Sequence, residues 1–291
     1  MKVSKNLQGF LLTYNLFLTK DHHKKMFFKS SNKDINAEEC DATGDATRLY
    51  CLAHKKIFLL FFIISCSLSV KAQHTITITF KNKVGDKTLN TDSIYTNQFD
   101  ETFKVRNCRY YISNIVFIDS INKKTQVYND EYFLIDEKDE VSKKITLNTS
   151  IQQITGIEFL LGVDSIKNVS GVQTGSLDPA KGMFWTWNTG YVMAKLEGTS
   201  PAANTPAHAF SYHIGGYKTG EDAARKIKLT LPGALAVNEN KKIIVTADIL
   251  KWFTGMHDIK ITDAAFCHEP GKLAMQFADN YANMFNVEIA Q

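Results

Sequence analysis

The residues with the most chemistry to offer in this sequence are histidines and a pair of tryptophans. Trp185 and Trp187 alternate in the stretch KGMFWTWNTGYVMAKLEG, which spans residues 181–198. Downstream of residue 73 the chain carries five histidines: His74, His208, His213, His257 and His268. A β-protein assembles a metal site from imidazoles on separate strands. These histidines are therefore candidate metal ligands, although each also has an ordinary structural interpretation.

His213 is the strongest of these candidates. In HAFSYHIGGY, strand alternation assigns Phe210, Tyr212 and Ile214 to one face, and His213 to the opposite face together with small residues. The two glycines that follow would let another group approach the backbone closely.

The other histidines have weaker contexts. We expect His208, His257 and His268 to lie in connections and face solvent. As an alternative for His268, the neighbouring Cys267 could contribute a soft ligand. His74 begins a strand on its apolar side, where it could cap the sheet or act as a ligand.

The tryptophans also have two interpretations. On one continuous strand, Trp185 and Trp187 would project from the same face, in phase with Tyr191. Such an aromatic face fills a core or forms a stacking platform for sugars.

Enzyme signatures are missing from the sequence. It contains no GxSxG elbow, P-loop, HExxH or DxDxDG calcium loop, and its acidic residues are scattered. We therefore expect a binding protein rather than an enzyme. From Gln73 onward there are 23 Lys and Arg against 24 Asp and Glu, so the charge balance does not indicate a nucleic-acid partner.

The beginning of the chain predicts export. Residues 55–72 begin with two lysines, followed by an apolar run and by small residues at Val70 and Ala72, which is the pattern of a signal peptide. The run is shorter than the roughly 20 residues that a membrane helix needs. We expect residues 1–54 to be a disordered upstream extension that does not belong to the gene, and the location to be periplasmic or secreted. The alternative is an outer-membrane lipoprotein anchored through Cys66, the only predicted membrane association.

Residues 73–291 read as one all-β domain. HTITITF (74–80) alternates strictly between apolar and polar residues, and further short strand patterns follow, separated by Gly, Asn, Asp and Pro clusters. This spacing predicts an antiparallel two-sheet β-sandwich. Residues 248–253 predict a helical turn. An apolar stripe of Leu273, Phe277, Tyr281 and Phe285 predicts a short C-terminal helix.

Two cysteines, Cys108 and Cys267, follow the predicted signal peptide. In an oxidising compartment they would be a disulfide or two buried thiols, and their spacing does not decide between these.

Taken together, several motifs resemble the MbnP-like family of periplasmic copper-binding proteins. They are GMFWTWNTGYVMAKLEG, preceded by LDPAK and followed by FSYHIGGY, with YYISNI earlier and ADNYANMF later. The resemblance runs in order over about residues 74–288.

The resemblance implies a β-sandwich that binds copper rather than catalysing a reaction. In relatives, the first Trp of a W-x-W motif is oxidised to kynurenine by a dihaem partner enzyme of the MauG type, and histidines complete the copper site. Carried over, the modified residue is Trp185 and the best histidine ligand is His213. We choose His74 as the second histidine, with His257 and His268 left open. The alternative function is an exported module that binds glycan or protein through Trp185, Trp187 and Tyr191 without a metal.

Overall fold

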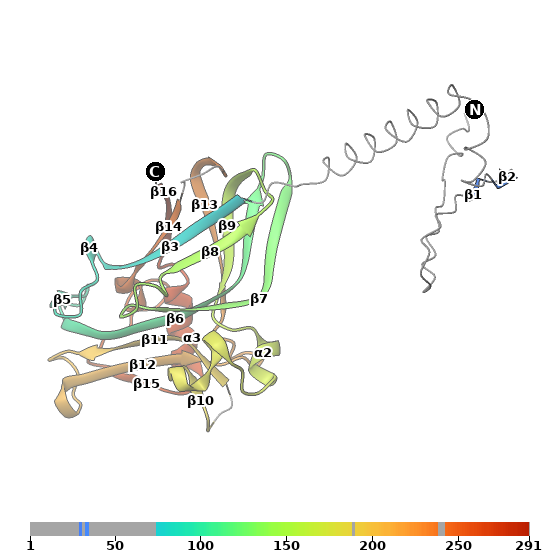
Figure 1. The fold of residues 1–291 in the computed structure, drawn as a ribbon. Coiled ribbons are helices and arrows are strands. Elements are labelled where there is room, and N and C mark those ends of the chain that lie inside the picture. The colour runs from blue at the N-terminus through green and yellow to red at the C-terminus, as the bar shows by residue number, and fades with distance from the viewer. Residues whose placement is uncertain (1–28, 31–32, 35–73, 188–189, 238–241, 291) are drawn as a thin grey trace, which may run out of the picture. The chain divides into compact units, whose positions relative to one another are not determined.

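The computed structural model describes residues 29–30, 33–34, 74–187, 190–237 and 242–290. The chain divides into two compact units, Met1–Lys71 and Ala72–Gln291. In the first unit, β1 (Lys29–Ser30) pairs with β2 (Lys33–Asp34) as a minimal antiparallel hairpin. The predicted signal peptide, Cys66 and the rest of the predicted upstream extension lie outside the described residues. The second unit contains the remaining elements (Figure 1).

One sheet of the second unit has five strands, in the order β16-β14-β3-β4, with β8 also paired to β3. Its strands are β3 (His74–Val84), β4 (Lys87–Thr88), β8 (Lys144–Thr149), β14 (Lys242–Asp248) and β16 (Phe285–Ala290). The predicted alternation in β3 is confirmed, since Ile76, Ile78 and Phe80 are buried and the threonines between them are not.

The other sheet has nine strands, with a central order of β13-β9-β6-β11-β12-β15. Strands β5 and β7 also pair with β6, and β10 pairs with β11. The strands are β5 (Tyr95–Thr96), β6 (Thr102–Asp119), β7 (Lys124–Asp136), β9 (Gln153–Leu161), β10 (Phe184–Trp185), β11 (Gly190–Thr199), β12 (Ala209–Gly215), β13 (Arg225–Ala236) and β15 (Phe266–Cys267).

Aromatic side chains join the two sheets in the core. Phe80 and Phe285 come from the five-stranded sheet, and Tyr110 and Phe159 come from the nine-stranded sheet. The ring centroids of Phe80 and Phe159 are 6.0 Å apart, and those of Tyr110 and Phe285 are 5.8 Å apart, all with edge-on geometry. The predicted two-sheet sandwich is confirmed. Both sheets are mixed rather than purely antiparallel, however, because β14 runs parallel to β3 and β15 runs parallel to β12.

The predicted C-terminal helix is α3 (Lys272–Tyr281), whose buried residues include Phe277 and Tyr281. The stripe ends earlier than predicted, because Phe285 starts β16 and enters the core between the sheets. The turn predicted at 248–253 is confirmed as η5 (Ile249–Trp252). The other short helices are α2 (Ser165–Val169), η2 (Gly175–Leu177), η3 (Pro179–Lys181) and η4 (Pro206–His208).

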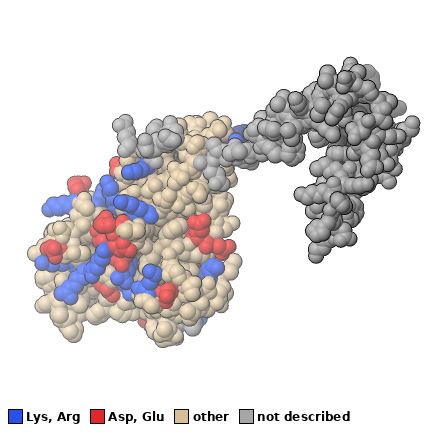
Figure 2. Space-filling view, in the orientation of Figure 1, with Lys and Arg blue, Asp and Glu red and all other residues tan. Residues whose placement is uncertain are grey.

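Within the described residues, neither α-helix has the length and apolar character required to cross a bilayer. Figure 2 shows acidic and basic side chains interspersed on the visible face rather than gathered by sign.

Candidate metal centre

Strand β12 places His213 on the outer face of the nine-stranded sheet. Phe210, Tyr212 and Ile214 are buried in the core, whereas Ser211 and His213 alternate with them and are only partly buried. The predicted phase of this strand is therefore confirmed. Its outer face is the one on which a polar site can be built.

Two neighbouring strands extend this polar face. In the register, His213 of β12 lies opposite Lys195 of β11, and Lys195 lies opposite Arg109 of β6. One step along, Ser211 lies opposite Glu197, and Glu197 lies opposite Asn107. Side chains directly opposite each other on one face of a sheet are neighbours. The pairing thus collects histidine, carboxylate, amide and cationic groups on one side of the sheet.

His213 has two polar neighbours on this face. Its Nε2 is 2.6 Å from Glu197 Oε1 and 3.1 Å from Ser211 Oγ. Asn107 Nδ2 donates to the other oxygen of Glu197, at 2.9 Å. The pKa of Glu197 is lowered to about 2, first by the hydrogen bond from His213 and then by that from Asn107, against the opposing effect of burial. Glu197 is therefore a carboxylate at neutral pH.

His268 completes the cluster from a distant part of the chain. It follows β15, which runs beside β12, and its ring stacks on that of His213 with centroids 4.3 Å apart and planes 25° apart. Its Nε2 is 2.8 Å from Ser211 Oγ, so both imidazoles direct Nε2 towards one hydroxyl. Although His268 is exposed overall, burial of part of its ring lowers its pKa, and the charge of His213 adds to this. The neutral imidazole, which has a free lone pair for a metal, is thereby favoured.

The second histidine beside His213 is therefore His268 rather than the predicted His74. His74 begins β3 in the five-stranded sheet, opposite Thr149 of β8, and Figure 1 shows β3 and β12 in separate parts of the fold. Strand phase gave His74 the correct side of its own sheet but carried no information about which sheet it joined.

The remaining two histidines interact elsewhere. His257 Nε2 is 3.3 Å from Asp279 Oδ2, and His208 Nδ1 is 3.1 Å from the backbone oxygen of Ala203. Neither interaction joins these residues to the His213 cluster.

The W-x-W stretch is a hairpin rather than one continuous strand. Trp185 ends β10 and lies opposite Gly190 at the start of β11, while Trp187 follows β10 in the turn. The prediction that both tryptophans share one strand face is therefore wrong. Trp185 is 6% exposed and Trp187 is 64% exposed, yet their rings remain 5.4 Å apart.

Tyr191, the third member of the predicted aromatic face, is fully buried. Its ring contacts Phe184 at a centroid distance of 5.0 Å, and its hydroxyl donates to Leu177 O. A stacking platform built from all three aromatic residues is thus not present.

Trp185 lies directly on the backbone of β12. A Cβ added to Gly215 would be 2.7 Å from Cζ3 of Trp185, a distance that real Cβ atoms do not adopt. The prediction that a glycine after His213 admits a close neighbour is confirmed at this position. Gly215 and His213 are two residues apart on one strand, about 7 Å along it. Trp185 therefore lies next to the histidine cluster.

The two cysteines are separate buried thiols, not a disulfide. Cys267 pairs with Tyr212 in the register and is buried with the core residues, on the opposite side of β15 from Phe266. Burial raises its pKa to about 11 and raises that of Cys108 further. Cys267 therefore lies on the core side of β15, in phase with Tyr212 and away from the face that carries His213.

A hollow of about 480 Å³ opens beside the cluster. Its lining includes His268, Trp187 and Phe266, and the last two are exposed aromatic residues. This hollow gives solvent access to His268.

The donor set suits copper in type. Imidazole is a good copper ligand, and a carboxylate bonded to a ligating histidine is a common supporting group. Within the described part of the chain, no three His, Cys, Asp or Glu residues are grouped as a complete metal site. The histidine pair therefore provides two candidate imidazole donors, and Trp185 lies beside them.

Of these residues, sequence reasoning found His213 and Trp185 but missed Glu197, Ser211 and the pairing with His268. Glu197 carried a usable signal, since the alternation of β11 puts it in phase with Lys195 on the outer face.

Fold and site together define a β-sandwich protein with a histidine pair on the outer face of one sheet, beside a buried tryptophan. The chain belongs to the MbnP family, whose profile matches residues 73–269. Among solved structures it is similar to MbnP from Methylosinus trichosporium, with 13% identity and a TM-score of 0.45, covering 76% of this chain and 100% of that chain. No curated protein matches it.

Proposed function

We propose that this protein binds copper through His213 and His268, next to Trp185. The observation that carries the proposal is the stacked histidine pair, whose ring centroids are 4.3 Å apart. Because Nε2 of His213 donates to Glu197, its Nδ1 is the nitrogen that would bind the metal. Membership of the MbnP family, which is associated with copper, supports this type of function.

Each residue of the cluster has a distinct role in this proposal. Neutral His268 offers a lone pair without first losing a proton. Glu197 holds His213 in place and, as an anion, favours a bound cation. Bound copper would serve as cargo, because we propose a binding or delivery protein and not an enzyme.

We further propose that Trp185 is oxidised to kynurenine by a dihaem enzyme of the MauG type. Oxidative cleavage of the indole five-membered ring, followed by loss of one carbon as formate, gives a net gain of one oxygen and loss of one carbon. Dioxygen, used by that enzyme, would be the oxidant: one oxygen atom is added to each carbon of the cleaved C2–C3 bond, and water then releases the formyl group as formate. The product carries an aromatic amine, which would be a third donor beside the two imidazoles.

The proposed location is the periplasm or the exterior, reached through the signal peptide at residues 55–72. Lipidation at Cys66 is the alternative. The alternative function, glycan or protein binding through an aromatic face, has only Trp187 exposed among its three residues.

Intact mass and copper binding test the proposal together. Protein purified from its native host should show the mass change of one kynurenine, absent from a Trp185→Phe variant and retained by Trp187→Phe. The native protein should bind one copper ion more tightly than the Trp185→Phe variant. An unmodified mass would overturn the kynurenine step, and the absence of stoichiometric copper binding would overturn the function.

A further inference from the structure

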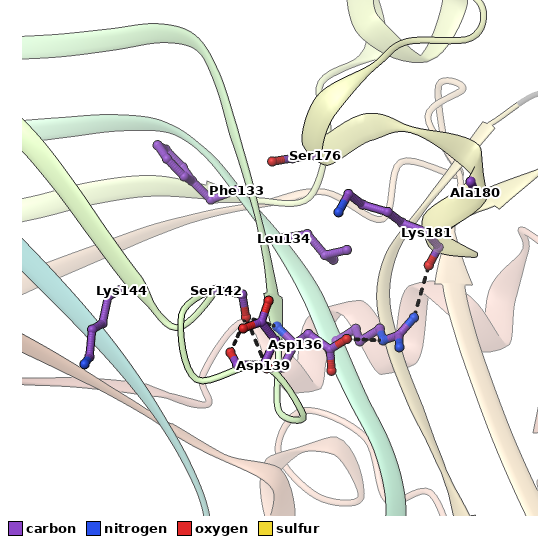
Figure 3. Close-up of a pocket in the computed structure, with 10 residues that line it drawn as sticks. Phe133, Leu134, Asp136, Asp139, Ser142, Lys144, Ser176, Ala180 and Lys181 are labelled. Atoms are coloured by element: carbon purple, nitrogen blue, oxygen red, sulfur yellow. Dashed lines mark hydrogen bonds and ion pairs between the residues drawn. The ribbon is translucent and has the colours of Figure 1, made fainter.

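The segment that carries Trp185 is tied to the sheet by an unusual set of hydrogen bonds. We call residues 175–187 the cover segment; it contains η2, η3 and β10. Four side chains of β6 and β11 donate to four of its backbone oxygens. These bonds are Tyr111 to Ser176, 3.1 Å; Tyr191 to Leu177, 2.9 Å; Arg109 to Lys181, 3.1 Å; and Lys195 to Gly182, 2.5 Å. Figure 3 shows the dashed line that reaches the backbone of Lys181.

Lys195 is the least expected member of this set. The residue is only 8% exposed, and within the described residues the one hydrogen bond of its side chain is from Nζ to Gly182 O. Burial lowers its pKa, as expected for an ammonium group removed from water; the negative charge of nearby Glu197 opposes this shift, and the positive charge of Arg109 adds to it. An apolar side chain could fill this space without the cost of removing a charge from water. A buried cation bonded to a carbonyl therefore points to a requirement for holding that carbonyl.

The carbonyl belongs to the residue that directs the chain into β10. Gly182 has a left-handed backbone, with φ 69°, and caps η3. The next residue, Met183, accepts a hydrogen bond from Val192 N at 2.9 Å, and Trp185 follows two residues later over Gly215. Fixing Gly182 therefore fixes the start of the short strand that seats the indole ring.

We propose that Lys195 is a positioning residue that holds Gly182 O and thereby keeps Trp185 seated on Gly215. Lys195 also lies directly opposite His213 in the pairing of β11 with β12. Its side chain therefore links the cover segment to the strand that carries His213. The consequence for copper rests on the proposed function, whereas the effect on Trp185 does not.

The test uses copper-free full-length protein in a Trp187→Phe background, so that Trp185 and the fully buried Trp252 remain. Lys195→Met is compared with Lys104→Met, which changes an exposed lysine on neighbouring β6. Lys195→Met should increase acrylamide quenching of tryptophan fluorescence several-fold, while Lys104→Met should leave it unchanged.

Hydrogen exchange separates positioning from general stability. Lys195→Met should accelerate exchange at the Val192 amide, which bonds to Met183, but not at amides of β3 and β14. Equal quenching and exchange in Lys195→Met and the parent protein would overturn the proposal. A uniform rise in exchange across both sheets would also overturn it, since that is the result of global destabilisation.

A second variant covers the case in which Lys195→Met does not fold. Gly182→Ala strains the same turn through its positive φ while meeting no atom within 4 Å. It should give the same local rise in quenching and exchange, and an unchanged Val192 amide would contradict the proposal. Copper affinity of each variant is measured last. If the parent protein binds no copper, the proposed function fails, but quenching and exchange still decide the role of Lys195.

Discussion

The five-stranded sheet and the outer face of β6, β11 and β12 use the same strand geometry for different purposes. On β3, apolar residues face the core and threonines face outward, as in an ordinary half-covered sheet. On β11 and β12, the outward positions hold Lys195, Glu197 and His213, and Lys195 is buried by the cover segment. The pairing of β11 is also irregular: its register with β12 shifts between Val192 and Ala194, and its register with β6 shifts between Glu197 and Gly198.

The difference between the two regions separates stability from function. Outward threonines need no partners, because water satisfies them. Outward His, Glu and Lys side chains that are partly covered by other segments need hydrogen-bond partners within the protein. Here the partners come from β6, β11 and β12 and from the segments that lie over them. Substitutions in the first region should therefore change folding, and substitutions in the second should change the site.

The largest expected effect is at the core of the five-stranded sheet. Phe80→Ala should lower the free energy of unfolding by about 3–5 kcal/mol, because a buried ring in contact with Tyr110, Phe159 and Phe285 is lost. Urea unfolding measures this. Copper affinity of the folded variant should match that of the parent protein. A selective loss of copper binding would break the separation between the two regions.

A smaller effect is expected where Trp185 meets β12. Gly215→Ala would place a Cβ 2.7 Å from both Trp185 and the backbone oxygen of Tyr191. We expect a loss of about 1–3 kcal/mol, as for other overpacked sites, with displacement of the indole detected as a red shift of its emission. Gly233→Ala is the matched control, since its added Cβ meets nothing within 4 Å. Equal stability of the two variants would contradict the close packing of Trp185.

The smallest effect concerns Glu197 and pH. Its pKa falls from 4.5 to about 2 on folding. A lowered carboxyl pKa contributes stability above about pH 4.5 that is lost as the pH falls towards 2. Because Glu197 is partly exposed, the contribution should be below about 1 kcal/mol. The stability difference between the parent protein and Glu197→Gln, measured by urea unfolding, should shrink between these pH values.

A difference that stays constant from pH 6 to pH 3 would show that the Glu197–His213 interaction does not set this pKa. Glu288→Gln, at an exposed position of β16, controls for the loss of one negative charge.

Local patterns predicted much of the fold. Alternation predicted β3 and the faces of β12, and the four-residue stripe predicted α3. The W-x-W stretch misled because its apolar alternation continues past the end of β10 at Trp185 into the turn at Thr186 and Trp187. The parallel pairings had no local signal, since β14 and β3 are far apart in the chain and meet only through the tertiary fold.

The site was only half predictable for the same reason. His213 and Trp185 stand in distinctive local sequences. His268 reaches His213 only because β15 docks along β12, and no periodicity within either segment encodes that contact. His74 was chosen as the second ligand from strand phase. Strand phase indicates which face of its sheet a residue occupies, but it does not indicate which of the two sheets contains the strand.

The most direct test of the central claim is a copper titration of three single variants, His213→Ala, His268→Ala and His74→Ala. Loss of a copper ligand should exceed the roughly 10–100-fold loss typical of outer-shell changes. The account therefore predicts at least about 100-fold weaker binding for His213→Ala and His268→Ala, with His74→Ala equal to the parent protein. Weakened binding in His74→Ala with full binding in His268→Ala would contradict it.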